Sequence, residues 1–158
     1  MQKIAPCLWF DTQAEQAAKF YVSIFKNSKI LKTTYYTKAG PKPKGEVLTV
    51  VFNLDGQQFI ALNGGPDFQF TEAVSFTVYC RNQREVDYFW TRLSKGGEPG
   101  PCGWLKDKFG LSWQIVPEII VKMISDPDST KVERAMRAIF KMKKLNIAKL
   151  KLAFSGKK

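Results

Sequence analysis

The chain has 158 residues, 44% of them hydrophobic and 25% charged, which fits one globular domain with a sizeable buried core. It contains no histidine. Histidine is the commonest metal ligand and the side chain that titrates nearest neutral pH, so serine–histidine and cysteine–histidine catalysis and histidine-bound metals are excluded. The cysteines, Cys7, Cys80 and Cys102, match no metal or redox spacing. We interpret them as reduced core thiols, with a reactive thiol as the alternative.

The net charge of +11 is concentrated near the C-terminus. Residues 1–130 hold 15 Lys and Arg against 13 Asp and Glu, whereas residues 131–158 hold ten against one. This basic segment has apolar residues at helical spacing, namely Val132, Met136, Ile139 and Phe140. We therefore expect a helix that docks on the body and carries incidental charge. Contact with an acidic surface, lipid or nucleic acid is the alternative, which we do not expect because no aromatic residues alternate with the basic ones.

The first half of the chain is predicted to form a strand, a helix and three further strands. An apolar strand over 3–10 leads into Thr12-x-x-Glu15, a capping box that predicts the start of a helix. The strand-like runs after this helix are 30–36, 46–54 and 57–63. Asp55-Gly56, between the last two runs, is a strong hairpin signal.

The second half repeats this order. A strand over 73–80 leads into Asn82-x-x-Glu85, the same type of cap, and Gly96-Gly97 ends the helix. The shorter strand-like runs that follow lie around 98, at 104–106 and at 111–116. After Pro117 the pattern becomes helical, and a break at 125–127 separates two helices.

This paired strand-helix-strand-strand-strand repeat resembles the vicinal oxygen chelate superfamily, which includes glyoxalase I, the bleomycin-resistance proteins and the extradiol dioxygenases. Within it, the chain is similar to the PhnB-like branch, whose members are often labelled 3-demethylubiquinone 3-methyltransferase. The similar segments are LWFDTQAEQAAKFYVSIF at 8–25, QQFIALNGGPDFQFTEAVSF at 57–76 and GWLKDKFGLSWQIVP at 103–117.

The resemblance implies an α+β fold in which paired βαβββ modules form a curled mixed sheet around a cavity, with extra C-terminal helices. We expect this domain over 1–125, with modules at about 1–64 and 72–117. A basic helical extension over 126–158 is expected to pack on it.

In that fold, helices cover the convex face of each sheet and the ligand lies on the concave face, so strand alternation assigns the side chains. The helix side is predicted to hold Ile60, Leu62, Val74, Phe76 and Val78. The concave side is predicted to hold Ala5, Cys7, Trp9, Phe59, Ala61, Asn63, Ser75, Thr77, Tyr79, Ser112 and Gln114.

The residues predicted to bind a ligand are Trp9, Asn63, Ser75, Thr77, Tyr79, Lys106 and Gln114. Trp9, with Trp104, Trp113, Phe10 and Tyr79, offers stacking surface, although large aromatic residues also serve as core. Lys106 either holds a ligand carboxylate or forms a solvated turn with Asp107. Asn63 either contacts the ligand or caps the end of its strand.

The resemblance places the metal ligands of metal-using relatives at four positions, which here are Ala5, Ala61, Ser75 and Gln114. Alanine has no donor atom, and serine and glutamine are poor ligands for a transition metal, so we predict no metal site. No cofactor is predicted either. The chain lacks the glycine-rich strand-to-helix turn that commonly holds S-adenosylmethionine.

The sequence therefore predicts a metal-independent small-molecule binding protein, whose ligand it does not specify, and a homodimer. The alternative is an enzyme that uses the same cavity for methyl transfer or for a metal-assisted step. No carboxylate falls on the predicted cavity face, so paired-carboxylate acid–base catalysis has no candidate. A cytoplasmic location is expected, because no signal-peptide pattern or membrane-length apolar run is present.

Overall fold

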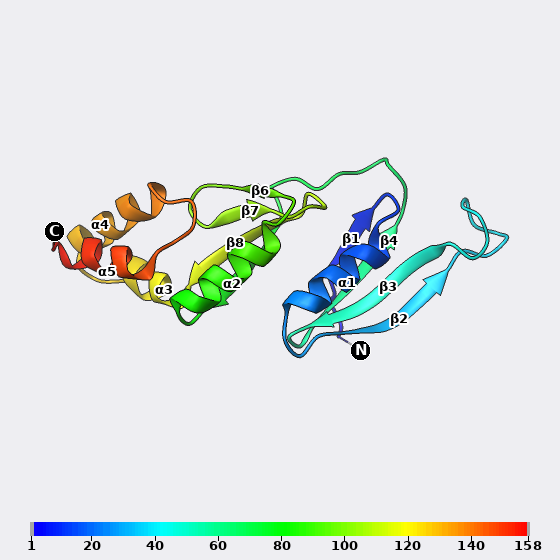
Figure 1. The fold of residues 1–158 in the computed structure, drawn as a ribbon, viewed down its shortest axis with the longest axis horizontal. Coiled ribbons are helices and arrows are strands. Elements are labelled where there is room, and N and C mark those ends of the chain that lie inside the picture. The colour runs from blue at the N-terminus through cyan, green and yellow to red at the C-terminus, as the bar shows by residue number, and fades with distance from the viewer. Residues whose placement is uncertain (1, 158) are drawn as a thin grey trace. The chain divides into compact units, whose positions relative to one another are not determined.

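The computed structural model describes residues 2–157. Its strands form two four-stranded mixed sheets, and one helix packs on each sheet (Figure 1). The chain divides into two units, residues 1–70 and 71–158, and each contains one of the sheets. The strand and helix order of both sheets is the predicted repeat. No helix among the described residues is long and apolar enough to cross a membrane.

The first sheet has the strand order β1-β4-β3-β2. Its elements are β1 (Cys7–Phe10), α1 (Ala14–Ile24), β2 (Lys29–Tyr35), β3 (Val47–Leu54) and β4 (Gln57–Asn63). Strand β1 runs parallel to β4, and the remaining pairs are antiparallel. The predicted hairpin between β3 and β4 is confirmed: Asp55 and Gly56 have φ values of 45° and 93°, as a two-residue turn of the right twist requires.

Aromatic packing fixes which face of the first sheet α1 covers. The ring of Tyr21 in α1 stacks on Phe52 of β3, with 6.2 Å between centroids, and Phe52 stacks on Phe59 of β4 at 5.5 Å. Ala61 shares this buried face with Phe59.

The sequence assignment of β4 is therefore shifted by one residue, and the prediction that Phe59, Ala61 and Asn63 face away from the helix is wrong. Ile60 and Leu62, predicted on the helix side, occupy the open face. Both faces of β4 are apolar, so alternation alone does not identify the buried one.

The start of α1 also differs from the prediction. Thr12 and Glu15 form no capping box, and no side chain caps the helix from its own first turn. The amide of Ala14 instead donates to the side-chain oxygen of Asn63, at 2.8 Å. A residue 49 positions away thus provides the acceptor that a local cap would supply.

The second sheet has the strand order β5-β8-β7-β6. Its elements are β5 (Ser75–Cys80), α2 (Gln83–Leu93), β6 (Glu98–Pro99), β7 (Trp104–Lys106) and β8 (Ser112–Pro117). The predicted cap of α2 is confirmed, because the Asn82 side chain accepts from the Glu85 amide at 3.1 Å. Phe76 lies opposite buried Trp113, and Val78 lies opposite buried Ile115, both on the side predicted for the helix. Val74 precedes β5 and is exposed, so its assignment to the helix side is wrong.

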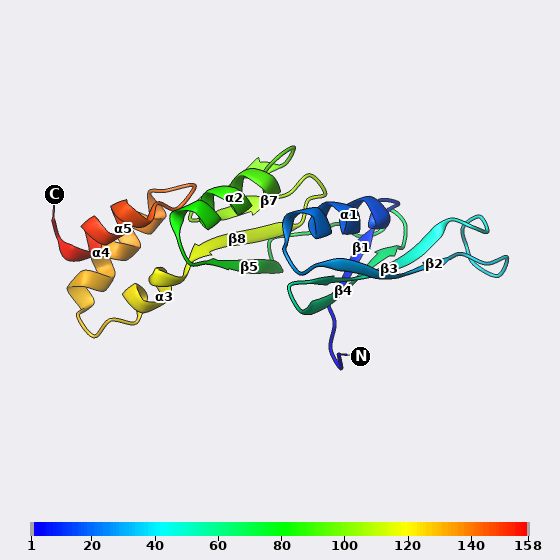
Figure 2. The same ribbon diagram turned by 60° about the horizontal axis from the view of Figure 1, so that its bottom comes forward.

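Three helices follow the second sheet (Figure 2): α3 (Glu118–Ile124), α4 (Ser129–Phe140) and α5 (Ile147–Ser155). They share a cluster of buried residues, which comprises Ile120, Met123, Ala135, Leu145 and Leu150. The predicted apolar stripe of the basic segment is partly wrong, because Met136 and Phe140 are 42% and 66% exposed. Ala135, completely buried, occupies the packed face of α4 in their place.

Hydrogen bonds join the connection between α4 and α5, and the start of α5, to the second sheet and its helix α2. The amides of Cys102 and Gly103 donate to the carbonyls of Met142 and Lys143, at 2.7 and 2.8 Å. The Gln83 side chain at the start of α2 accepts from the Ile147 amide at 2.9 Å.

Candidate functional site

The open face of the second sheet carries most of the predicted ligand-binding residues. In the register of β5 and β8, Ser75 lies opposite Ser112 and Thr77 opposite Gln114. In the register of β7 and β8, Trp104 lies opposite Gln114 and Lys106 opposite Ser112. Because residues paired across strands share a face, polar and aromatic side chains from three strands lie together here.

One hydrogen bond organises the centre of this face. The Gln114 amide nitrogen donates to the Ser75 hydroxyl at 2.9 Å. Tyr79, further along β5, is 57% exposed. The structure therefore places Ser75, Thr77, Tyr79, Lys106 and Gln114 on one sheet face; that they contact a ligand stays a prediction.

A pocket of about 470 Å³ adjoins this face within the second unit. Its lining is mainly apolar and comes from the segment before β5, the strands β6, β7 and β8, the β6–β7 loop and the end of α4. The lining residues are Glu72, Glu98, Pro99, Gly100, Pro101, Cys102, Trp104, Leu105, Lys106, Ser112 and Phe140. A volume of this size accommodates a small organic molecule.

An ion pair at the pocket joins Lys106 to Glu72, with 2.6 Å between Nζ and Oε1. The hydrogen bond from Lys106 lowers the pKa of the Glu72 carboxyl, and the same bond raises the pKa of the Lys106 ammonium. Both side chains are partly exposed, so the pair is solvated and exchangeable rather than a fixed part of the core.

Ser112 provides a polar group with no protein partner. The residue is 1% exposed, and its hydroxyl makes no hydrogen bond within the described part of the chain. A buried hydroxyl without a partner costs about 1–3 kcal/mol, so such groups are few in folded proteins. Ser112 lines the pocket, but its hydroxyl oxygen is covered, so a bound molecule could reach it only after a neighbouring side chain moved.

Asp107, next to Lys106, is not part of a solvated turn. It is 3% exposed, and one carboxylate oxygen accepts from the amides of Phe109 and Leu111, at 2.8 and 3.1 Å. The other oxygen accepts from the Trp113 indole at 2.9 Å. Asp107 therefore holds the β7–β8 turn, and Trp113 belongs to the buried side of the sheet.

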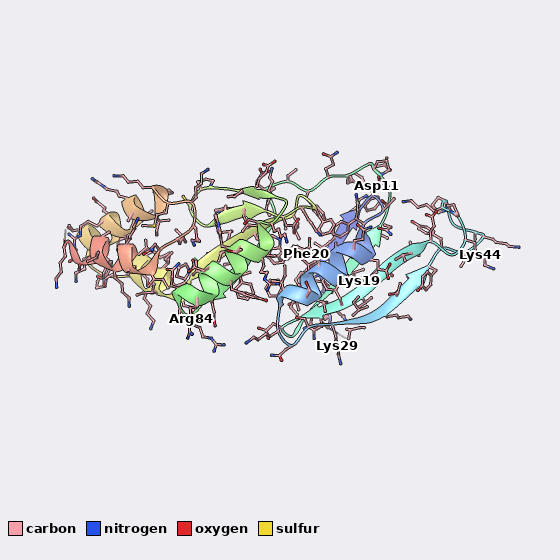
Figure 3. All side chains as sticks on the ribbon, in the orientation of Figure 1. Asp11, Lys19, Phe20, Lys29, Lys44 and Arg84 are labelled. Atoms are coloured by element: carbon pink, nitrogen blue, oxygen red, sulfur yellow. The ribbon has the colours of Figure 1, made fainter. Side chains whose placement is uncertain are left out.

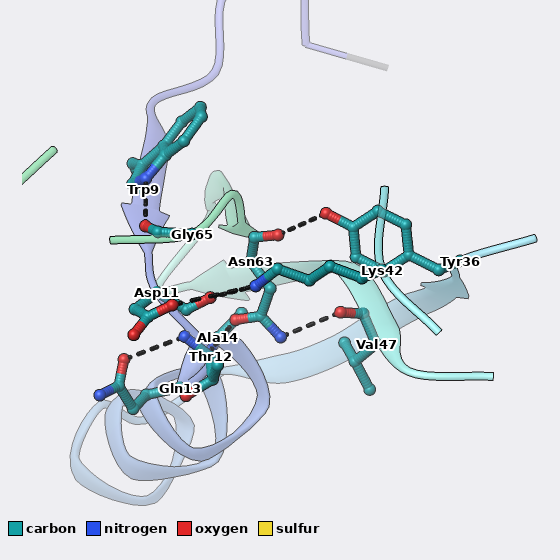
Figure 4. Close-up of polar contacts among 10 residues, drawn as sticks. All are labelled: Trp9, Asp11, Thr12, Gln13, Ala14, Tyr36, Lys42, Val47, Asn63 and Gly65. Carbon is teal, nitrogen blue, oxygen red and sulfur yellow. Dashed lines mark hydrogen bonds and ion pairs between the residues drawn. The ribbon is translucent and has the colours of Figure 1, made fainter. Parts of the chain in front are cut away.

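Trp9, in the first unit, lies on the open face of its sheet, opposite Leu62 of β4. Its indole donates to the Gly65 carbonyl at 2.9 Å (Figure 4), and Phe68 contacts the ring edge to face at 5.0 Å. Gly64 lies so close that an added Cβ would be 2.2 Å from a ring carbon. These contacts favour the packing interpretation of Trp9.

Both polar atoms of the Asn63 side chain make hydrogen bonds within the protein (Figure 4). Its oxygen accepts from the Ala14 amide, and its nitrogen donates to the Val47 carbonyl at 3.0 Å. Its backbone carbonyl accepts from the Tyr36 hydroxyl at 2.6 Å. The residue caps α1 and joins it to β3, so we do not retain it as a ligand-binding candidate.

The donor set at the metal positions of metal-using relatives does not fit a transition metal. Ala61 lies on the α1 side of its sheet, and its neighbours on the open face, Ile60 and Leu62, have no donor atoms. Ser75 and Gln114 are hydrogen-bonded to each other. Residues 2–157 contain no group of three His, Cys, Asp or Glu side chains that could hold a metal ion.

Most residues that line the pocket were not predicted from the sequence, and two of them, Glu72 and Phe140, matter for ligand binding. The sequence pattern predicts Phe140 as a residue that docks α4 on the body. In the structure α4 packs through Ala135 instead, which leaves Phe140 66% exposed at the pocket. Glu72 lies outside any strand, so no periodicity marked it as a partner of Lys106.

Comparison with solved structures defines the class of fold. The PhnB protein from Bacillus cereus is 34% identical, with a TM-score of 0.65, and the match covers 73% of this chain and 99% of that one. A Pseudomonas aeruginosa protein matches at 16% identity and a TM-score of 0.62, covering 75% and 98%. The fosfomycin resistance protein FosX from Listeria monocytogenes matches at 14% identity and a TM-score of 0.50, covering 74% and 93%.

The last two matches bear on the fold alone. With the paired βαβββ topology, they confirm the predicted glyoxalase/bleomycin-resistance fold. The family described as 3-demethylubiquinone-9 3-methyltransferase matches residues 2–116. The chain belongs to this family, as the resemblance to its PhnB-like members indicated. None of the curated proteins matches the chain.

Proposed function

We propose that this protein is a metal-independent small-molecule binding protein and that its second unit binds an aromatic molecule with one anionic group. The observation that carries the proposal is the pocket of about 470 Å³ lined by Trp104, Phe140, Lys106 and Ser112. A mostly apolar cavity with a few convergent polar groups is the usual form of a small-molecule site.

Each class of lining residue suits one part of such a ligand. The rings of Trp104 and Phe140 favour a flat apolar body, because aromatic pairs gain free energy beyond their buried area. The Lys106 ammonium suits a carboxylate, which would replace Glu72 in the ion pair. Ser112 lies beside Lys106 in the sheet, but its hydroxyl is covered, so the proposal does not depend on it.

Metal independence follows from the donors themselves. Binding through stacking and one ammonium group needs no Lewis acid, and alanine, serine and glutamine at the positions that ligate metal in metal-using relatives are poor ligands for a transition metal. We therefore expect affinity for the ligand to survive treatment with a chelator.

A titration calorimetry experiment with 2-naphthoate, an aromatic monoanion, tests this proposal on EDTA-treated protein. Lys106→Gln should weaken binding about tenfold, because a charge-assisted hydrogen bond contributes roughly 1.5 kcal/mol. Glu72→Gln should strengthen binding, because it removes the competing carboxylate. Lys108→Gln, which makes the same charge change outside the pocket lining, is the matched control and should have little effect.

The opposite directions expected for Lys106→Gln and Glu72→Gln separate a specific site from general attraction to a basic protein. Equal weakening by Lys106→Gln and Lys108→Gln would show that naphthoate responds only to net charge and would refute the proposal. Loss of binding after EDTA treatment that Zn²⁺ or Ni²⁺ restores would refute its metal independence.

A further inference from the structure

A second hollow, of about 350 Å³, lies between α4 and the end of α5. Its lining residues are Arg134, Arg137, Ala138, Lys141, Ala153, Gly156 and Lys157. Arg134 and Arg137 of α4 and Lys141, the residue that follows the helix as its C-cap, are spaced at i, i+3 and i+7, so they lie on one face. The other lining residues are two alanines and a glycine, which are too small to fill the space between the long cationic side chains.

Arg134 is held in a fixed position at this hollow. Its Nε donates to the Ala153 carbonyl at 3.1 Å, and one terminal nitrogen donates to the Phe154 carbonyl at 2.8 Å. Gly156 has a φ of 73°, and a Cβ at that position would lie 3.3 Å from the guanidinium carbon. A preorganised guanidinium loses less side-chain entropy when it binds an oxyanion.

The cations of the hollow have fewer acidic partners than neighbouring cations have. Lys131 pairs with Asp128, and Lys144 pairs with Asp87, at 3.7 and 2.6 Å. Among residues 2–157, Arg137 is the one cation of the hollow in an ion pair, with 3.5 Å between its NH2 and exposed Glu133, and Arg134 is near enough to Asp128 to help lower the pKa of that carboxyl.

The first unit contrasts with this arrangement. Its exposed lysines are dispersed over separate elements, as Lys19 in α1, Lys29 in β2 and Lys44 in the β2–β3 loop show (Figure 3). Dispersed lysines are typical of a solvated surface, whereas the cations of the hollow converge on one space.

The negative C-terminal ends of the helix dipoles balance only part of the positive charge at the hollow. Helices α4 and α5 both end near the hollow, and each C-terminus carries about half a negative charge. Among residues 2–157, Glu133 and these two helix ends offset about half of the four positive charges, and Asp128 offsets part of the rest, so a net positive charge remains on the lining side chains. Repulsion among them disfavours the empty hollow and favours a bound anion.

We propose that this hollow is a binding site for the phosphate groups of a compact, soluble polyphosphate, independent of the pocket in the preceding section. Guanidinium and ammonium groups bind phosphate oxygens through short, charge-assisted hydrogen bonds, and arginine binds them in pairs. The lining contains no aromatic side chain on which a nucleic-acid base could stack and no large apolar side chain that could enter a bilayer. The cations come from one face of α4, from its C-cap and from the residue after Gly156, and charges gathered in so small an area favour a compact anion over an extended one. Part of the positive charge of residues 131–158, expected from the sequence to be incidental, is therefore gathered at one site.

Titration calorimetry with sodium tripolyphosphate at physiological salt tests the proposal on the full chain. The double variant Arg137→Gln/Lys141→Gln removes two cations of the hollow. Its matched control, Lys149→Gln/Lys151→Gln, removes two exposed cations of α5 that do not line the hollow. We expect binding to the wild type, a loss of about tenfold or more in the first variant, and less than about threefold in the control.

Three further measurements complete the test. Circular dichroism melting identifies any loss of fold, and Lys157→Gln, beyond the end of α5, gives a second variant that cannot disturb helix packing and should weaken binding severalfold. Parallel titrations with phosphatidylglycerol vesicles and with poly(U) RNA distinguish the sources of phosphate.

Equal weakening in the two double variants would overturn the proposal. So would vesicle or RNA binding that depends on Arg137 and Lys141 without tripolyphosphate binding.

Discussion

Replacing Asn63 by alanine should destabilise the protein rather than impair a binding site. The side chain accepts from the Ala14 amide at 2.8 Å and donates to the Val47 carbonyl at 3.0 Å, and the residue is 7% exposed. Alanine removes both bonds and leaves a buried amide at the first turn of α1 without an acceptor. An orphaned buried group costs about 1–3 kcal/mol and an ordinary hydrogen bond about 1 kcal/mol. The free energy of unfolding should therefore fall by about 2–4 kcal/mol.

Urea unfolding followed by far-ultraviolet circular dichroism measures this loss. Tyr36→Phe provides a graded comparison, because it removes only the hydroxyl that donates to the Asn63 carbonyl, and it should cost about 1 kcal/mol. A change within about 0.5 kcal/mol for Asn63→Ala, the usual range for a solvent-facing site, would refute the capping role and would restore Asn63 as a ligand-binding candidate.

Three further predictions concern packing and ionisation. Gly64→Ala should cost more than about 2 kcal/mol in urea unfolding, because the new Cβ would lie 2.2 Å from a ring carbon of Trp9, and Trp9→Ala in the same chain should remove most of that cost. Burial raises the pKa of Cys80 from 9.0 to about 12, so an unfolded chain loses this proton at a lower pH than the folded one. The free energy of unfolding should then decline as pH rises from 9.0 to about 12, and Cys80→Ala should flatten that decline if the assignment is right. Removing residues 131–158 should lower the melting temperature or cause aggregation, because it uncovers Ile120 and Met123; an unchanged melting temperature would contradict the docking of the extension.

The repeat of strands and helices was predictable because it depends on local signals. The Asp55-Gly56 turn and the Asn82 cap are set by residues adjacent in sequence, and both appear in the structure as expected. The boundaries of β4 and β7 also agree with the predicted runs.

The local sequence pattern did not predict which face of β4 is buried or how the first turn of α1 is capped. Phe59 and Ile60 are both apolar, so the choice of buried face depends on the stacking of Phe59 with Phe52. The cap of α1 comes from Asn63, far away in sequence, and a search for capping boxes examines only the first turn.

The polar sheet face beside the pocket was predictable, because one face of each strand is clearly polar. In β5 and β8, alternation separates Ser75, Thr77 and Gln114 from the apolar residues, and the structure places them together. The Glu72–Lys106 pair and the contribution of Phe140 depend on tertiary packing between distant segments, which leaves no periodic signal in the sequence.

The most direct test of the central claim is a crystal structure of EDTA-treated protein soaked with 2-naphthoate. The account predicts electron density for the ring against Trp104 and Phe140, with the carboxylate within hydrogen-bond distance of Lys106 Nζ and with Glu72 displaced from it. Naphthoate bound away from these residues, or an empty pocket at a ligand concentration that saturates calorimetric binding, would contradict it.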